Sequence, residues 1–152
     1  MKIIGLDLGD RWVGIAISDR LQMTCRPLKT VTLSTVVPEL QTLLKSEQIE
    51  RLIIGLPRTM RGTESDQTAK IRMQAEHVIT ELNLALKREI PYTLWDERLS
   101  SRMAQNVMIQ KNAKKQLGKG PSLEHAVAAA FILQTYLDSK AFHAPAHQDD
   151  SP

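Results

Sequence analysis

The sequence predicts an α/β domain built on a five-stranded mixed sheet with helices on both faces. Segments of β-like character alternate with segments whose apolar residues recur at helical spacing. Two β-like runs, 2–8 and 12–18, are separated by three residues, as in a tight antiparallel hairpin. A continuous apolar run over 51–56 is closed by a proline, which is typical of a central parallel strand. With 152 residues and 42% hydrophobic content, we expect one domain over 1–139 and a disordered tail over 140–152.

The N-terminal third is expected to form an antiparallel meander followed by a helix. Residues 2–8 and 12–18 form the first two strands, and 28–33 alternates apolar and polar side chains like a half-exposed third strand. Ser34 or Thr35 can cap the next helix, which should end near residue 46.

The rest of the chain alternates strands and helices, so the fourth and fifth strands should run parallel. The fourth strand spans 51–56. It is followed by a helix over 63–88, a strand over 91–95, a helix from about 100 to 109 and a last helix over 123–137.

Composition favours a cytoplasmic protein but does not identify its binding partner. Twenty Lys and Arg against 17 Asp and Glu give a formal charge of +3, a mild bias compatible with a polyanion. Aromatic residues make up 4% of the chain, which disfavours an aromatic stacking platform. The single Cys25 excludes an intramolecular disulfide and fits a reducing compartment. We expect no membrane association, because no apolar run approaches the roughly 18 residues of a membrane span.

Asp7 is the unusual residue of the first predicted strand. It interrupts an apolar run between Gly5 and Gly9, and a buried carboxylate is costly unless it is paired, hydrogen-bonded or bound to a metal. Hydrogen bonds to neighbouring backbone amides are one explanation. A second is a metal shared with Glu97, which follows the fifth strand and can approach Asp7 if the two strands lie together. Two carboxylates so placed suit Mg²⁺ or Mn²⁺.

Two groups of proteins share a Gly-x-Asp-x-Gly turn of this kind after a first strand. In ribonuclease H-like nucleases the aspartate holds a metal, whereas in the actin, Hsp70 and sugar kinase group the turn contacts ATP phosphates. The second group needs two large lobes, so a length of 152 residues favours the nucleases.

Five segments carry a more specific resemblance: GLDLGDRWVGIAISD at 5–19, IGLP at 54–57, GTE at 62–64, DERLS at 96–100 and ILQTYL at 132–137. In these segments the chain resembles the YqgF family. This family consists of RuvC-related proteins of ribonuclease H-like fold that are described as Holliday junction resolvases or pre-16S rRNA nucleases. The resemblance implies a ribonuclease H-like fold for nearly the whole chain up to about residue 137.

The resemblance also implies a metal-dependent phosphodiesterase with one or two Mg²⁺ or Mn²⁺ ions. Asp7 and Glu97 would be acidic metal ligands, together with a third acid at the start of the last helix. That third position falls on His125, with Glu124 beside it. A histidine can bind Mn²⁺ but is a poorer ligand for Mg²⁺. Alternatively, both residues simply occupy the first turn after Ser122, where the helix dipole favours a glutamate.

Eight basic residues are candidates for contacting nucleic acid. Arg11 and Arg98 adjoin the two acids. Arg58 and Arg61 make basic a loop in which Thr59 and Arg61 stand where the family is expected to have an asparagine and an aspartate. A lysine cluster precedes the last helix: Lys111, Lys114, Lys115 and Lys119. Phosphate contact is one role for these cations. Surface solvation and simple ion pairs are the alternatives.

The resemblance implies an endonuclease that acts on pre-16S rRNA 5′ ends during ribosome biogenesis. Resolution of Holliday junctions in DNA recombination or repair is the second candidate. A non-catalytic nucleic-acid-binding or ribosome-associated protein is the alternative from another class. A resolvase cuts two symmetric strands and needs a dimer, but no dimer seam is evident in the sequence, so we expect a monomer or weak homodimer.

Overall fold

The computed structural model describes residues 1–57, 65–96 and 123–143. Five strands form one sheet in the order β3-β2-β1-β4-β5. The antiparallel meander consists of β1 (Lys2–Leu8), β2 (Trp12–Ser18) and β3 (Cys25–Thr32), while β4 (Ile49–Leu56) and β5 (Tyr92–Asp96) run parallel to β1. The predicted five-stranded mixed sheet is therefore confirmed.

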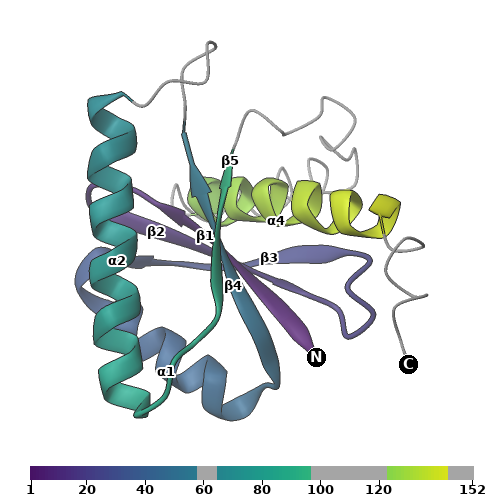
Figure 1. Ribbon diagram of the computed structural model, residues 1–152, viewed down its shortest axis with the longest axis horizontal. Coiled ribbons are helices and arrows are strands. Elements are labelled where there is room, and N and C mark those ends of the chain that lie inside the picture. Colours follow the sequence, from purple (N-terminus) through teal and green to yellow (C-terminus); the bar gives the residue numbers. More distant parts are fainter. Residues whose placement is uncertain (58–64, 97–122, 144–152) are drawn as a thin grey trace.

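Helices cover both faces of this sheet, as predicted. One face carries α1 (Val36–Ser46), which follows a short 3₁₀ turn, and α2 (Asp66–Leu86). The other face carries α4 (Leu123–His143), which crosses the meander strands and packs most extensively on β2. Figure 1 shows α1 and α2 on one side of the strands and α4 on the other.

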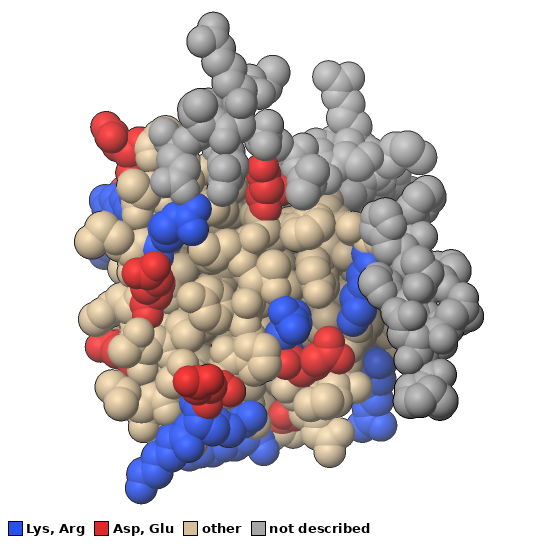
Figure 2. Space-filling model, in the orientation of Figure 1, with Lys and Arg blue, Asp and Glu red and all other residues tan. Residues whose placement is uncertain are grey.

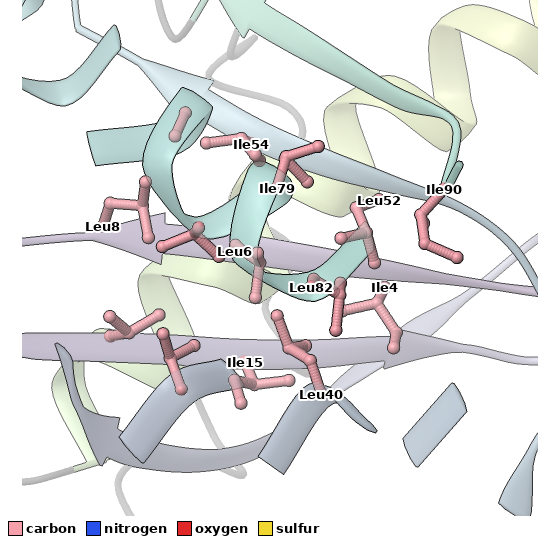
Figure 3. Close-up of a cluster of buried hydrophobic side chains, with 14 of the residues drawn as sticks. Ile4, Leu6, Leu8, Ile15, Leu40, Leu52, Ile54, Ile79, Leu82 and Ile90 are labelled. Carbon is pink, nitrogen blue, oxygen red and sulfur yellow. The ribbon is translucent and has the colours of Figure 1, made fainter. Parts of the chain in front are cut away.

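The alternation of side chains along β1 divides the hydrophobic core into two layers. Ile4, Leu6 and Leu8 are buried toward α1 and α2, where Figure 3 shows them among side chains of both helices. Ile3 is buried on the opposite face with Leu133 of α4. Asp7 follows Ile3 and Gly5 in this alternation and therefore lies on the α4 face.

Several boundaries differ from the sequence prediction for local reasons. The third strand begins at Cys25 and not at residue 28, because its pairing with β2 extends to Ser18. The side chain of Ser65 accepts a hydrogen bond from the backbone N–H of Thr68, so α2 begins at residue 66. Thr35 precedes α1 as predicted, but its side chain makes no capping hydrogen bond.

Two further outcomes concern the site and the C-terminal end. The condition given for the approach of Asp7 and Glu97, that their strands lie together, is not met, because β4 lies between β1 and β5. The last helix continues six residues past 137, so residues 140–143 are helical and not part of a disordered tail. Lys140 in this extension pairs with Glu50 at 3.4 Å.

The predicted helix at 100–109 and residues 144–152 lie outside the described residues. Within the described part, no helix is long and apolar enough to cross a membrane.

Candidate active site

The candidate site begins with Asp7, whose side chain is 23% exposed on the α4 face of the sheet. Its neighbour across the antiparallel pair is Gly14 of β2. Burial raises the pKa of Asp7 above its ordinary value, and the charge of nearby His125 partly opposes this effect. The ionised form of a carboxylate in a poorly solvated position is stabilised by a cationic partner.

Among the described residues, His125 is the one that pairs with Asp7. It lies in the first turn of α4, and its Nδ1 is 3.8 Å from Oδ2 of Asp7. The imidazole is 37% exposed and therefore accessible from solvent. Glu124, the neighbouring candidate, is exposed on the helix surface. The structure therefore pairs Asp7 with His125 and leaves Glu124 on the outside of the helix.

Glycines allow α4 to approach the sheet closely enough for this pairing. A Cβ atom on Gly14 would overlap the backbone carbonyl of His125, and one on Gly5 would lie 2.8 Å from Cβ of Leu133. These glycines are needed for space rather than for an unusual backbone conformation. The sequence shows the glycines, but the helix that needs them follows more than a hundred residues later, so this role is missed by motif reasoning.

Trp95 fixes the end of β5 against the same helix. Its indole Nε1 donates a 2.8 Å hydrogen bond to Oγ1 of Thr135, and its ring meets that of Tyr136 edge-on at 5.2 Å. Glu97 follows β5 directly, two residues after Trp95. This anchoring of β5 was not predicted, because a lone tryptophan in a strand gives no indication of its partner.

Most of the predicted basic residues lie outside the described residues, as does Glu97. They are Arg58, Arg61, Arg98, Lys111, Lys114, Lys115 and Lys119. Arg11 is described: it is exposed in the β1–β2 turn with its guanidinium 5.5 Å from the ring centre of Trp12. It lines a groove on the α1 and α2 side, and that lining contains neither Asp7 nor His125.

On the face that Figure 2 shows, the described charges do not form a surface of one sign. Figure 2 shows basic side chains lying beside acidic ones on the viewed face. The described part of the chain also contains no cluster of three or more His, Cys, Asp and Glu residues that could hold a metal. Asp7 and His125 thus make up the described portion of the candidate site, with one carboxylate and one imidazole as possible ligands.

Comparisons with known proteins show which family the chain belongs to. The family model RuvX, described as Holliday junction resolvase, matches residues 1–139. A protein of Desulforamulus reducens named "Putative pre-16S rRNA nuclease" is 35% identical over 93% of this chain and 99% of its own length. A protein of the same name from Oceanobacillus iheyensis is 35% identical over 92% of this chain and its own full length.

Solved structures show the same fold at low sequence identity. RuvC of T. thermophilus in complex with a Holliday junction substrate has a TM-score of 0.59 at 15% identity, covering 97% of this chain and 96% of that one. The yeast mitochondrial Holliday junction resolvase Ydc2 has a TM-score of 0.56 at 13% identity, covering 97% and 81%. Since both the family model and the relatives span nearly the whole chain, this protein belongs to the RuvX, or YqgF, family that its motifs predict.

Proposed function

We propose that this chain is a divalent-metal-dependent endonuclease that hydrolyses phosphodiester bonds in nucleic acid. The pairing of Asp7 with His125 carries the proposal. Family membership alone would be compatible with a protein that has lost its activity. Asp7 is poorly solvated and lies 3.8 Å from the solvent-accessible imidazole of His125. Its ionised carboxylate destabilises the fold, but it is well placed to bind a cation.

The donor set fits a divalent ion that accepts both oxygen and nitrogen ligands. Asp7 supplies carboxylate oxygens and His125 an imidazole nitrogen; we assign the further carboxylate to Glu97, just beyond β5. This set suits Mn²⁺ better than Mg²⁺, which prefers oxygen ligands alone. When bound, such an ion supplies an activated water and neutralises charge on the phosphate. Asp7 must be ionised to act as a ligand, which its raised pKa opposes in the metal-free protein.

For the substrate we propose precursor 16S rRNA, cut at its 5′ end during ribosome biogenesis in the cytoplasm. The support is the name and full-length similarity of relatives such as the Desulforamulus reducens protein. A four-way DNA junction is the second candidate, supported by the description of the family model. Basic residues outside the described part would contact phosphates in either case: Arg58, Arg61, Arg98, Lys111, Lys114, Lys115 and Lys119. Junction cleavage would further require a symmetric dimer.

The test compares both substrates in both metals. Purified protein is incubated with precursor 16S rRNA and, separately, with a four-way DNA junction, in Mg²⁺ or Mn²⁺, alongside Asp7→Asn and Glu97→Gln. We expect wild-type protein to cut the RNA and both variants to lose the activity. Equal cutting by wild type and Asp7→Asn would refute the mechanism. Binding of RNA without any cleavage would instead establish the non-catalytic alternative.

A further inference from the structure

A side chain of α2 holds the turn that follows Asp7. Nε2 of Gln74 donates a 3.2 Å hydrogen bond to the backbone carbonyl of Gly9. From the α4 side, His125 approaches the same residue, because a Cβ atom on Gly9 would lie 3.9 Å from Cε1 of the imidazole. Gly9 is thus in contact with α2 on one face of the sheet and adjoins the candidate site on the other. A shift of this turn would change how the end of β1 meets the imidazole.

Two other contacts hold the rest of the turn. Lys70, one helical turn before Gln74 in α2, pairs with Asp10 at 2.7 Å, but both charged side chains are largely exposed, so water and salt weaken this ion pair. Arg11 is held through its backbone carbonyl, which accepts a 2.8 Å hydrogen bond from the N–H of Leu33. Of the two side chains of α2, Gln74 is the half-buried one, and its hydrogen bond is less exposed to water.

The helix that carries Gln74 is itself attached to the core of the domain. Ile71, Ala75 and Val78 of α2 are buried among the side chains of the sheet and α1. At the start of the helix, Thr68 is fully buried, and its Oγ1 donates to the backbone carbonyl of Pro57, directly after β4. A hydrogen bond from this helix therefore fixes the turn relative to the core.

The amide of Gln74 is present at a cost to stability. Because the carbonyl of Gly9 can only accept, the hydrogen bond sets the orientation of the amide and leaves Oε1 as an acceptor. Among the described residues, this oxygen is buried without a hydrogen-bond partner, which destabilises the folded state. An apolar side chain of similar shape would avoid that cost but could not donate to Gly9. The amide therefore adds little net stability, while its N–H group fixes the turn.

We propose that Gln74 is a positioning residue for the metal site. By holding the carbonyl of Gly9, it keeps the turn after β1 in the position in which Asp7 and His125 bind one ion together. Gln74 acts through the backbone of the turn and is not itself a ligand. This inference rests on the proposed function, because it assigns a supporting residue to the proposed metal site.

The experiment compares two glutamines that hold the turns at the two ends of β2. Gln134 of α4 is 6% exposed, and its Nε2 donates to the backbone carbonyl of Met23 at 3.0 Å, in the turn after β2. Gln74→Met and Gln134→Met each remove the donor and keep an unbranched side chain of similar length. For each variant and wild type we measure Mn²⁺ affinity by electron paramagnetic resonance, the urea midpoint of unfolding, and the ¹⁵N relaxation of the turn amides in EDTA.

The two variants should differ in opposite ways. We expect Gln74→Met to bind Mn²⁺ about tenfold more weakly, the lower end of the effect of losing a residue that supports a metal ligand. Its urea midpoint should equal or exceed that of wild type, and the amide of Gly9 should become more mobile. Gln134→Met should unfold at lower urea and keep wild-type Mn²⁺ affinity. If Gln74→Met fails to fold, Gln74→Asn, whose donor is one methylene shorter, should show the same loss of affinity.

Three results would overturn the role of Gln74. Wild-type Mn²⁺ affinity in folded Gln74→Met would make its hydrogen bond an ordinary structural contact. An equal loss of affinity in Gln134→Met would show that any weakened turn has this effect. Unchanged mobility of Gly9 would show that the turn is fixed by other contacts. Wild-type protein that binds no Mn²⁺ would refute the metal site and the proposed function as well, so the two failures are distinguishable.

Discussion

Gly14 of β2 lies directly beneath His125, so that a Cβ atom on the glycine would overlap the histidine's backbone carbonyl. This contact between a strand and the first turn of a helix determines how close the imidazole comes to Asp7. The candidate site therefore depends on a residue that carries no functional group. Its geometry is set by backbone packing before any ligand binds.

The variant Gly14→Ala should consequently lose both stability and metal binding. The added methyl group must push α4 away from β2, and overpacking of this kind costs about 1–3 kcal/mol. Thermal unfolding measures the first effect and Mn²⁺ titration the second. Gly5→Ala serves as the comparison, since its nearest clash at 2.8 Å is with a side-chain atom of Leu133, eight residues further along α4. A larger loss of Mn²⁺ affinity in Gly5→Ala than in Gly14→Ala would contradict this explanation.

Replacing Asp7 by asparagine should abolish cleavage and yet stabilise the metal-free protein. Burial raises the pKa of Asp7, so its ionised form costs free energy in the folded state. Below the ordinary carboxyl pKa, Asp7 is neutral whether the protein is folded or unfolded, and wild type and variant should unfold alike. The difference should develop as the pH rises from the ordinary carboxyl pKa to the raised folded-state pKa and stay constant above it, on the order of 1 kcal/mol at neutral pH.

Thermal unfolding in EDTA across this pH range measures the effect of Asp7→Asn. Asp66→Asn, at an exposed position in the first turn of α2, is a control for removing a carboxylate elsewhere. A variant that is less stable than wild type at neutral pH would mean that Asp7 is a structural ion-pair partner.

His125 is expected to determine the metal preference. Because imidazole is a better ligand for Mn²⁺ than for Mg²⁺, wild-type cleavage should be faster in Mn²⁺. His125→Asp should raise activity in Mg²⁺ by about tenfold or more, the scale of a ligand's effect on affinity or activity. The measurement is the ratio of the cleavage rate in Mn²⁺ to that in Mg²⁺ on one RNA substrate. No change in that ratio would make His125 an ordinary helix residue.

The hydrogen bond between Trp95 and Thr135 should stabilise the end of β5. Thr135→Val keeps the shape of the side chain but leaves the indole Nε1 without its acceptor, at a cost of about 1–3 kcal/mol. Chemical denaturation measures the loss, and Thr80→Val, at an exposed position of α2, is the matched control. Equal stability of the two variants would show that the hydrogen bond contributes nothing.

Cys25 should react with thiol reagents only when the protein opens. Burial, aided by the negative charges of Asp138 and Asp19, raises the pKa of its thiol to about 12. The thiol also donates to the carbonyl of Ala130 at 3.1 Å. A colorimetric disulfide reagent at pH 8 should label the native protein slowly and the denatured protein at once. Rapid labelling of the native protein would contradict this burial.

The sequence identified the strands and Asp7 because these depend on local patterns. Alternation, continuous apolar runs and a carboxylate between glycines are all readable within about ten residues. It did not reveal that β4 separates β1 from β5, since strand order depends on which helix packs on which face. Gly14 contacts His125, which lies 111 positions later, and Gly9 accepts a hydrogen bond from Gln74, which lies 65 positions later. No local pattern encodes such contacts.

The proposed site is tested most directly by asking whether Asp7 and His125 hold one metal ion together. Mn²⁺ binding, followed by electron paramagnetic resonance, is measured for wild type, Asp7→Asn, His125→Ala and the exposed-site control Glu124→Gln. We expect Asp7→Asn and His125→Ala each to lose at least about tenfold in Mn²⁺ affinity, the usual effect of removing a metal ligand or its support, while Glu124→Gln binds like wild type. Unchanged Mn²⁺ affinity in Asp7→Asn would contradict the proposed site.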